Sequence, residues 1–147
     1  MLFNKNQNLV IVMDEKSNKI VGQHIIMANS FFTRFKGLMM KKELAAGEGL
    51  LLSKTKQIHT FWMRIPIDVV YLKRLDVEKV GFSFDEASKT TKYEIVGLVE
   101  HMEPWKIGKY YSHADSVLEL KAGQIKQQSL HLNTKLVLKN VLNSQYC

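Results

Sequence analysis

Apolar residues recur along the chain in short runs, and most of these runs have the composition of β-strands. The first two are NLVIVM at residues 8–13 and IVGQHIIM at residues 20–27, on either side of a polar cluster at residues 14–18. Such an arrangement is typical of a hairpin. Further runs lie at residues 49–52, 57–63, 67–73, 77–84, 93–101, 116–120 and 134–141, and the polar residues 85–92 suit a long hairpin loop. The pattern predicts about eight short strands.

One segment has a different period. Phe31, Phe32, Phe35, Leu38 and Met39 follow one another at helical spacing, after residues Asn29 and Ser30 that can cap exposed amides. This predicts one short helix near residues 30–37. Together with the strands it indicates an α+β, mainly β fold, with a largely antiparallel sheet that is curved or partly closed.

Length and composition predict a single domain over residues 1–147. The chain has 46% hydrophobic and 24% charged residues and contains no linker-like stretch. Its longest apolar runs fall well short of the roughly 18 residues that a membrane-spanning helix needs. The N-terminus has no signal-peptide pattern. We therefore expect a cytoplasmic protein without a membrane segment.

The number of cysteines and the distribution of charge exclude some classes of function. The single cysteine, Cys147, is the last residue, which excludes a disulfide framework and a thiolate metal cluster. The net charge is +7. Residues 1–75 carry 12 Lys and Arg against 5 Asp and Glu, whereas residues 76–147 carry 9 of each. This asymmetry fits a solvated basic surface better than a nucleic-acid site, because the lysines follow no nucleic-acid-binding motif.

Four motifs resemble the DUF192 family, also called the COG1430 group. They occur in the family's order and approximate spacing: RFKGLM at residues 34–39, IHTFWMRIPID at 58–68, PW at 104–105 and VLELKAG at 117–123. The resemblance extends from about Val21 to Val141. It implies a small, mainly β domain with a short helix that carries Arg34, and it implies no activity, because the family is defined without one.

The chain departs from the family pattern at two places. The segment between Leu72 and Glu94 is longer than the tight turn common in the family, and Asn133 and Thr134 stand where Gly and Asp are usual. Asn tolerates a positive φ, so we expect the turn at Asn133 to persist. A ligand role for the missing acid is not expected.

Arg34 is the first candidate site residue. It lies at the edge of the helical apolar stripe, and a buried guanidinium needs a carboxylate partner. The candidates are Asp68 and Glu119, each on a predicted strand between apolar neighbours. Two interpretations stay open: a structural Arg–carboxylate clamp between helix and sheet, and a site for an anionic or carboxylate ligand.

His59 is the second candidate, because its unperturbed pKa lies near neutrality and it belongs to a motif of the resemblance. With Asp68 as its orienting partner it could act as a general base in a hydrolase or isomerase. The alternative is a structural histidine. The catalytic residues stay unknown beyond these two candidates, because no nucleophile lies in a recognisable motif.

Metal and cofactor binding are not expected. The candidate ligands lack the spacing of dedicated metal sites; they are His59, His101, His113, Asp68, Asp115 and Glu119. Trp105 and the pair Tyr110 and Tyr111 fit stacking on a sugar or base. Trp105, which follows Pro104, alternatively fits a plug at an open barrel end.

Three hypotheses follow. The first is a binding module for a small polar or anionic ligand, and the second is an enzyme that uses His59 and Asp68. The third is a basic interaction module for nucleic acid or an acidic protein. We rank the binding module first, with its pocket around Arg34, His59, Trp62, Asp68, Trp105 and Glu119.

Overall fold

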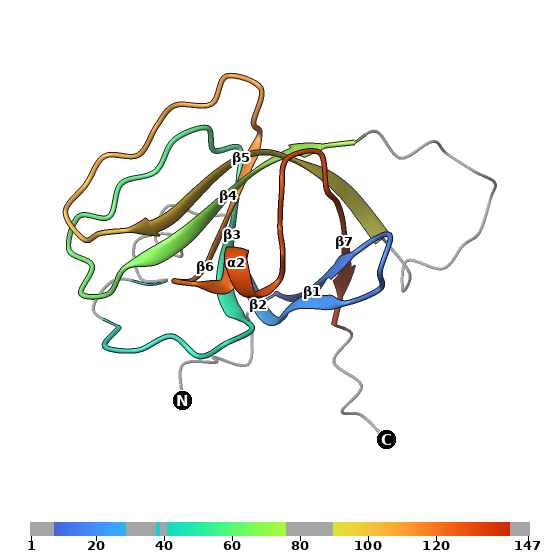
Figure 1. The fold of residues 1–147 in the computed structure, drawn as a ribbon, viewed down its shortest axis with the longest axis horizontal. Coiled ribbons are helices and arrows are strands. Elements are labelled where there is room, and N and C mark those ends of the chain that lie inside the picture. The colour runs from blue at the N-terminus through green and yellow to red at the C-terminus, as the bar shows by residue number, and fades with distance from the viewer. Residues whose placement is uncertain (1–7, 29–37, 39–40, 76–89, 142–147) are drawn as a thin grey trace.

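The structure is a computed structural model that describes residues 8–28, 38, 41–75 and 90–141. Within these residues it contains seven strands and one short helix, labelled as in Figure 1. They are β1 (Leu9–Asp14), β2 (Ile20–Ala28), β3 (Glu48–Ser53), β4 (Ile67–Arg74), β5 (Thr90–Met102), β6 (Ser116–Lys121), α2 (Gln124–Gln127) and β7 (Lys135–Asn140).

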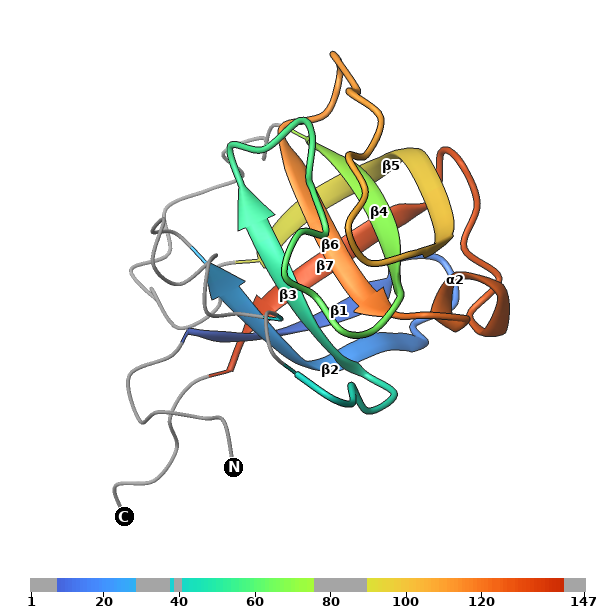
Figure 2. The ribbon, with the colours of Figure 1, turned by 90° about the vertical axis from the view of Figure 1, so that its left-hand side faces the viewer.

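The strands form a closed barrel in the order β1-β2-β3-β6-β4-β5-β7, and β7 pairs with β1. Neighbouring strands are antiparallel except for β2 and β3, which run parallel. Closure satisfies the backbone groups that an open sheet would leave at its edges. Figure 2 shows the barrel strands, with α2 at the end of β6.

Two layers of apolar side chains explain why the central strands are apolar on both faces. Val70 and Leu72 of β4 belong to a core to which every strand contributes, and this core fills the barrel. Val69 and Tyr71, which point the other way along β4, belong to a second cluster on the outside of the barrel. Residues 67–72 are buried throughout, because both faces of β4 are covered.

The prediction of a mainly β, single-domain fold with a curved or partly closed sheet is confirmed, and the sheet is fully closed. The described residues contain seven strands where about eight were expected for the chain. The predicted helix near residues 30–37, which includes Arg34, and the predicted strand at 77–84 lie outside the described residues. The strand predicted at 57–63 is wrong, because this segment forms turns and a single β-bridge at His59. The loop predicted at 85–92 is wrong at its end, since β5 begins at Thr90 and residues 90–92 pair with β7.

Candidate functional site

Asp68 is a fully buried carboxylate with a structural set of partners. Its Oδ1 accepts a hydrogen bond from the His101 amide and its Oδ2 accepts one from the Ile125 amide, each at 2.8 Å. His101 has a φ of 49°, and Ile125 lies in α2. Hydrogen bonds to an ionised acceptor are among the stronger ones in proteins. Asp68 therefore ties the end of β5 and the start of α2 to β4.

Glu119 is the second buried acid. It lies on β6 opposite Leu50 of β3 and Val69 of β4, and its exposed fraction is 6%. Among the residues that the structure describes, no hydrogen bond or ion pair reaches its carboxylate. Burial raises the pKa of Glu119 to about 7, because the charged form loses its hydration. Arg34, its predicted partner, lies outside the described residues, so the clamp stays a prediction.

Tyr71 lies on the outer face of β4, one strand away from Glu119. Its hydroxyl donates a hydrogen bond to the Lys109 carbonyl at 2.9 Å, and its ring lies 4.1 Å from that of Tyr111. Burial raises the pKa of Tyr71 to about 12, with smaller contributions from Tyr111 and Glu119. Tyr71 therefore anchors the loop that carries Lys109 and Tyr111 to the barrel wall.

His59 is exposed and lies at the surface, where its partners differ from those predicted. Its Nδ1 accepts a hydrogen bond from the Phe61 amide at 3.3 Å, and its ring stacks on that of Phe61 with centroids 4.8 Å apart. In the described part of the chain no hydrogen bond joins His59 to Asp68. Asp68 already uses both carboxylate oxygens, so the geometry gives no support to a His59–Asp68 acid–base pair.

Two loops lie side by side on the barrel and form what we call the loop ribbon, residues 54–66 and 103–113 (Figure 1). Backbone hydrogen bonds join them at several points. The Gly108 amide donates to the Ile58 carbonyl at 2.8 Å, and the Tyr111 amide donates to the Lys56 carbonyl at 3.0 Å. His59 and Ile107 also form an antiparallel bridge. The ribbon therefore has a defined backbone although neither loop is a strand.

Thr60 holds the two tips of the ribbon together. Its hydroxyl donates to the Glu103 carbonyl at 2.6 Å and accepts from the Lys106 amide at 2.9 Å. Its carbonyl also accepts a hydrogen bond from the Trp105 amide at 2.9 Å. The residue is fully buried. A threonine in this setting acts as a cross-link, because each of its polar groups is matched by the opposite loop.

Both tryptophans occupy backbone conformations that most residues avoid. Trp62 has a φ of 67° in a turn in which the Met63 amide donates to the Thr60 carbonyl, and Trp105 has a φ of 64° directly after Pro104. A positive φ favours Gly or Asn and costs a bulky residue on the order of 1 kcal/mol or more. The two turns therefore hold large rings where stability alone would favour small residues.

The rings meet in a row at the surface that we call the aromatic platform: His59, Phe61, Trp105 and Trp62. Phe61 is half-buried, and the other three side chains are exposed. Trp62 and Trp105 are 57% and 55% exposed, and they pack edge to face with centroids 4.8 Å apart and planes at 63°. The Phe61 ring lies 6.2 Å from that of Trp105. Contiguous exposed rings of this size usually mark an interaction surface.

The loop ribbon is predominantly basic. Lys54, Lys56, Arg64, Lys106 and Lys109 are its basic side chains, and Glu103 is its single acid. Nε2 of His101 lies 2.8 Å from the Glu103 carboxylate, so that acid is engaged at the surface. Lys54, Arg64 and Lys106 are exposed and have no ion-pair partner among the described residues. An anionic ligand would meet little repulsion here.

Comparison with known proteins decides the family. Residues 10–83 match the family described as DUF192, uncharacterized ACR, COG1430. The chain belongs to the DUF192 family. The matched region contains Trp62 and Asp68 and ends before Trp105 and Glu119. No curated protein sequence matches the chain.

Two solved structures share the fold of this DUF192 protein. A proposed transcription regulator from Sinorhizobium meliloti 1021 superimposes with a TM-score of 0.61 at 17% identity, over 91% of this chain and 93% of that one. A protein of unknown function from Novosphingobium aromaticivorans DSM 12444 gives a TM-score of 0.63 at 16% identity, over 87% and 82%. At such identities the likeness shows the fold alone.

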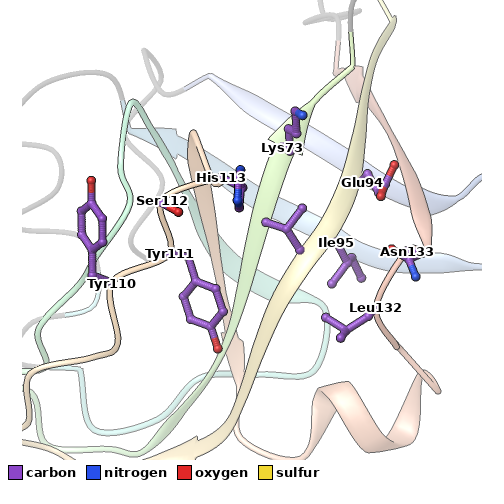
Figure 3. A pocket seen from close by; sticks show the side chains of 10 residues that line it. Lys73, Glu94, Ile95, Tyr110, Tyr111, Ser112, His113, Leu132 and Asn133 are labelled. Atoms are coloured by element: carbon purple, nitrogen blue, oxygen red, sulfur yellow. The ribbon is translucent and has the colours of Figure 1, made fainter.

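A pocket of about 380 Å³ lies at the other end of the ribbon (Figure 3). Tyr110, Tyr111 and His113 line it from the ribbon, and Lys73 and Glu94 line it from β4 and β5. The remaining lining residues are Ile95, Val96, Ser112, Leu132 and Asn133. Its charges are of mixed sign and none of its side chains belongs to the predicted site.

Of the predicted site residues in this DUF192 protein, the structure brings together His59, Trp62 and Trp105 and leaves Asp68 and Glu119 in the interior. Phe61 and Thr60 also belong to the site, although neither was a predicted site residue. Their signal was present, since both lie between His59 and Trp62 in the motif of residues 58–68.

The described residues of this DUF192 protein contain neither a metal-binding cluster nor a membrane-spanning helix. In that part of the chain, no group of three or more His, Cys, Asp or Glu side chains is placed to hold a metal ion. The helix that the structure describes there is also too short to cross a membrane.

Proposed function

We propose that this DUF192 protein is a binding module whose aromatic platform holds an anionic ligand that contains a ring. One observation carries the proposal. The chain exposes its two tryptophans next to each other and fixes both in left-handed backbone conformations. Strained residues of this kind persist where the surrounding structure enforces them, and they concentrate at binding sites.

The predicted ligand, a small polar or anionic molecule, agrees with the charge of the ribbon, whereas the location of the site changes. Ring faces bind flat or apolar surfaces by stacking, and Lys106 and Arg64 lie on the same two loops as the tryptophans. Asp68 and Glu119 are excluded from this version of the site, because both are buried. A cytoplasmic location stays a prediction from the sequence.

Intrinsic fluorescence provides a selective test, because Trp62 and Trp105 are the only tryptophans of the chain. We expect adenosine monophosphate and glucose 6-phosphate, one with a flat base and one with a sugar alone, to change the emission in a saturable manner. A single stacked ring and one phosphate should give a Kd on the order of 1 mM.

Asparagine is the informative replacement, because it removes the ring and tolerates the positive φ of both turns. Trp62→Asn and Trp105→Asn should each weaken binding several-fold, with the remaining tryptophan as the reporter. The double variant should show no binding heat in calorimetry while circular dichroism stays native. Leu132→Asn is the matched control and should bind normally, because this side chain is 54% exposed and lines the pocket at the other end of the ribbon.

The proposal fails if neither compound gives a saturable change, or if the folded double variant binds as well as the unmodified protein.

A further inference from the structure

We propose that the loop ribbon binds single-stranded nucleic acid, with bases stacked on the aromatic platform and phosphates held by the basic side chains of the same two loops. This inference rests on the proposed function, because it requires the platform to be the binding surface. It adds the ligand class and the polymeric nature of the ligand.

The shape of the platform is the first argument. Its rings follow one another as His59, Phe61, Trp105 and Trp62, with successive centroids 4.8, 6.2 and 4.8 Å apart. A compact ligand covers one or two rings, whereas a row of four suits a chain of flat groups. Successive bases of a single strand stack on aromatic side chains in this way, each contributing about 1–3 kcal/mol.

The distribution of charge is the second argument. The basic side chains are spread along the ribbon, from Lys54 through Arg64 on one loop and at Lys106 and Lys109 on the other. A neutral sugar would form no ion pair with these side chains, whereas a nucleic acid presents one phosphate per nucleotide. This spread of the basic side chains along the ribbon also differs from a membrane anchor, in which the cations surround a single inserted loop tip.

The exposed aromatic surface of Trp62 and Trp105 favours single strands over duplexes. The bases of a duplex already stack on one another, so their faces are not available to Trp62 or Trp105. A single strand offers those faces without unpairing. Ile107, which is 69% exposed between Trp105 and Gly108, adds apolar surface along the same path. The ribbon thus has the two components that sequence-tolerant single-strand binders combine: stacking rings and a line of cations.

The test measures anisotropy of a fluorescein-labelled oligo-dT of about twelve nucleotides, the length range of one such binding surface. The same strand annealed to oligo-dA, heparin, and vesicles of phosphatidylcholine with phosphatidylserine are the comparison ligands. We expect micromolar binding of the single strand at low salt, weaker binding of the duplex, and a salt slope of about −0.7 per neutralised phosphate.

Two sets of variants separate stacking from charge. The double variant Trp62→Asn and Trp105→Asn should weaken binding of the single strand at least fivefold with an unchanged salt slope. The triple variant Lys54→Gln, Arg64→Gln and Lys106→Gln should reduce the salt slope by about 2.

The matched control for charge is a second triple variant, at exposed lysines outside the ribbon. Lys126→Gln, Lys135→Gln and Lys139→Gln remove the same charge from α2 and β7 and should leave the slope unchanged.

Several results would overturn the inference. Equal affinity for duplex and single strand, or no effect of the tryptophan variants, would reduce the binding to general attraction by a basic surface. Binding of the vesicles with no binding of oligo-dT would assign the ribbon to a membrane. Binding of adenosine monophosphate or glucose 6-phosphate with no binding of oligo-dT would refute the nucleic-acid inference and leave the proposed function standing. Failure of all of these ligands would refute both.

Discussion

Replacement of Glu119 by glutamine should remove a large part of the pH dependence of stability. The carboxyl is 6% exposed, and burial raises its pKa from 4.5 to about 7. The folded state then binds more protons than the unfolded state between these two values, so the free energy of unfolding falls as the pH rises from 4.5 towards 7 and levels off above it. Glu119→Gln has no proton to lose and should not show this fall.

The magnitude follows from the pKa change. One pKa unit corresponds to about 1.4 kcal/mol. A carboxyl whose pKa rises from 4.5 to about 7 therefore destabilises the fold at alkaline pH by about 3 kcal/mol relative to low pH. Between about pH 5 and about pH 8 the expected loss is about 2 to 3 kcal/mol, because some of the change occurs below this range.

The assay is urea unfolding followed by circular dichroism at several pH values over that range. The difference between the unmodified protein and Glu119→Gln isolates this residue from all other titrating groups. A buried glutamine amide without partners costs about 1–3 kcal/mol at every pH, so this cost offsets the curve of the variant without adding any pH dependence. Glu100→Gln, at an exposed position of β5, is the control. Parallel pH curves for Glu119→Gln and the unmodified protein would refute the reasoning.

Three further changes test the fold and the ribbon. Asp68→Asn should lower the free energy of unfolding by about 2–4 kcal/mol in urea titrations, because one oxygen that accepts a backbone amide becomes a donor; unchanged stability would contradict this. Thr60→Val should lower the free energy of unfolding by about 1–3 kcal/mol and speed hydrogen exchange of the Lys106 amide, because that amide loses its acceptor. Unchanged protection of the Lys106 amide would show that Thr60 is not the cross-link. Gly97→Ala should destabilise by about 1–3 kcal/mol, because a Cβ there would overlap the Tyr111 ring, and Tyr111→Ala should relieve most of that effect in the double variant; additive losses would count against the overlap.

Local sequence pattern was sufficient for several elements. The β-branched run at residues 8–13, the polar cluster after it and the run at 20–27 predicted β1, its turn and β2, because period and turn chemistry depend on neighbours in sequence. The turn at Asn133 also follows from residue type, and its φ is 68°. The strand predicted at 57–63 failed, because Thr60 and Trp62 form a turn whose partners lie on another loop.

The candidate site could be predicted only in part. The motif of residues 58–68 and the dipeptide at 104–105 indicated the side chains, and the placement of Asp68 on an apolar face indicated its burial. Its partners are backbone amides of His101 and Ile125, which no residue type signals because every residue except proline has an amide.

By itself the sequence determined that this chain is a mainly β domain, that β1 and β2 lie on either side of a polar turn, and that Asp68 lies between apolar neighbours. Tertiary structure alone decided that β2 and β3 run parallel, that the barrel closes through β1 and β7, and that the two tryptophans meet. The physical reason is the separation in sequence of the residues that interact. Periodicity and turn preference are properties of adjacent residues, whereas the contact between two rings 43 positions apart depends on the pairing of the loops that carry them.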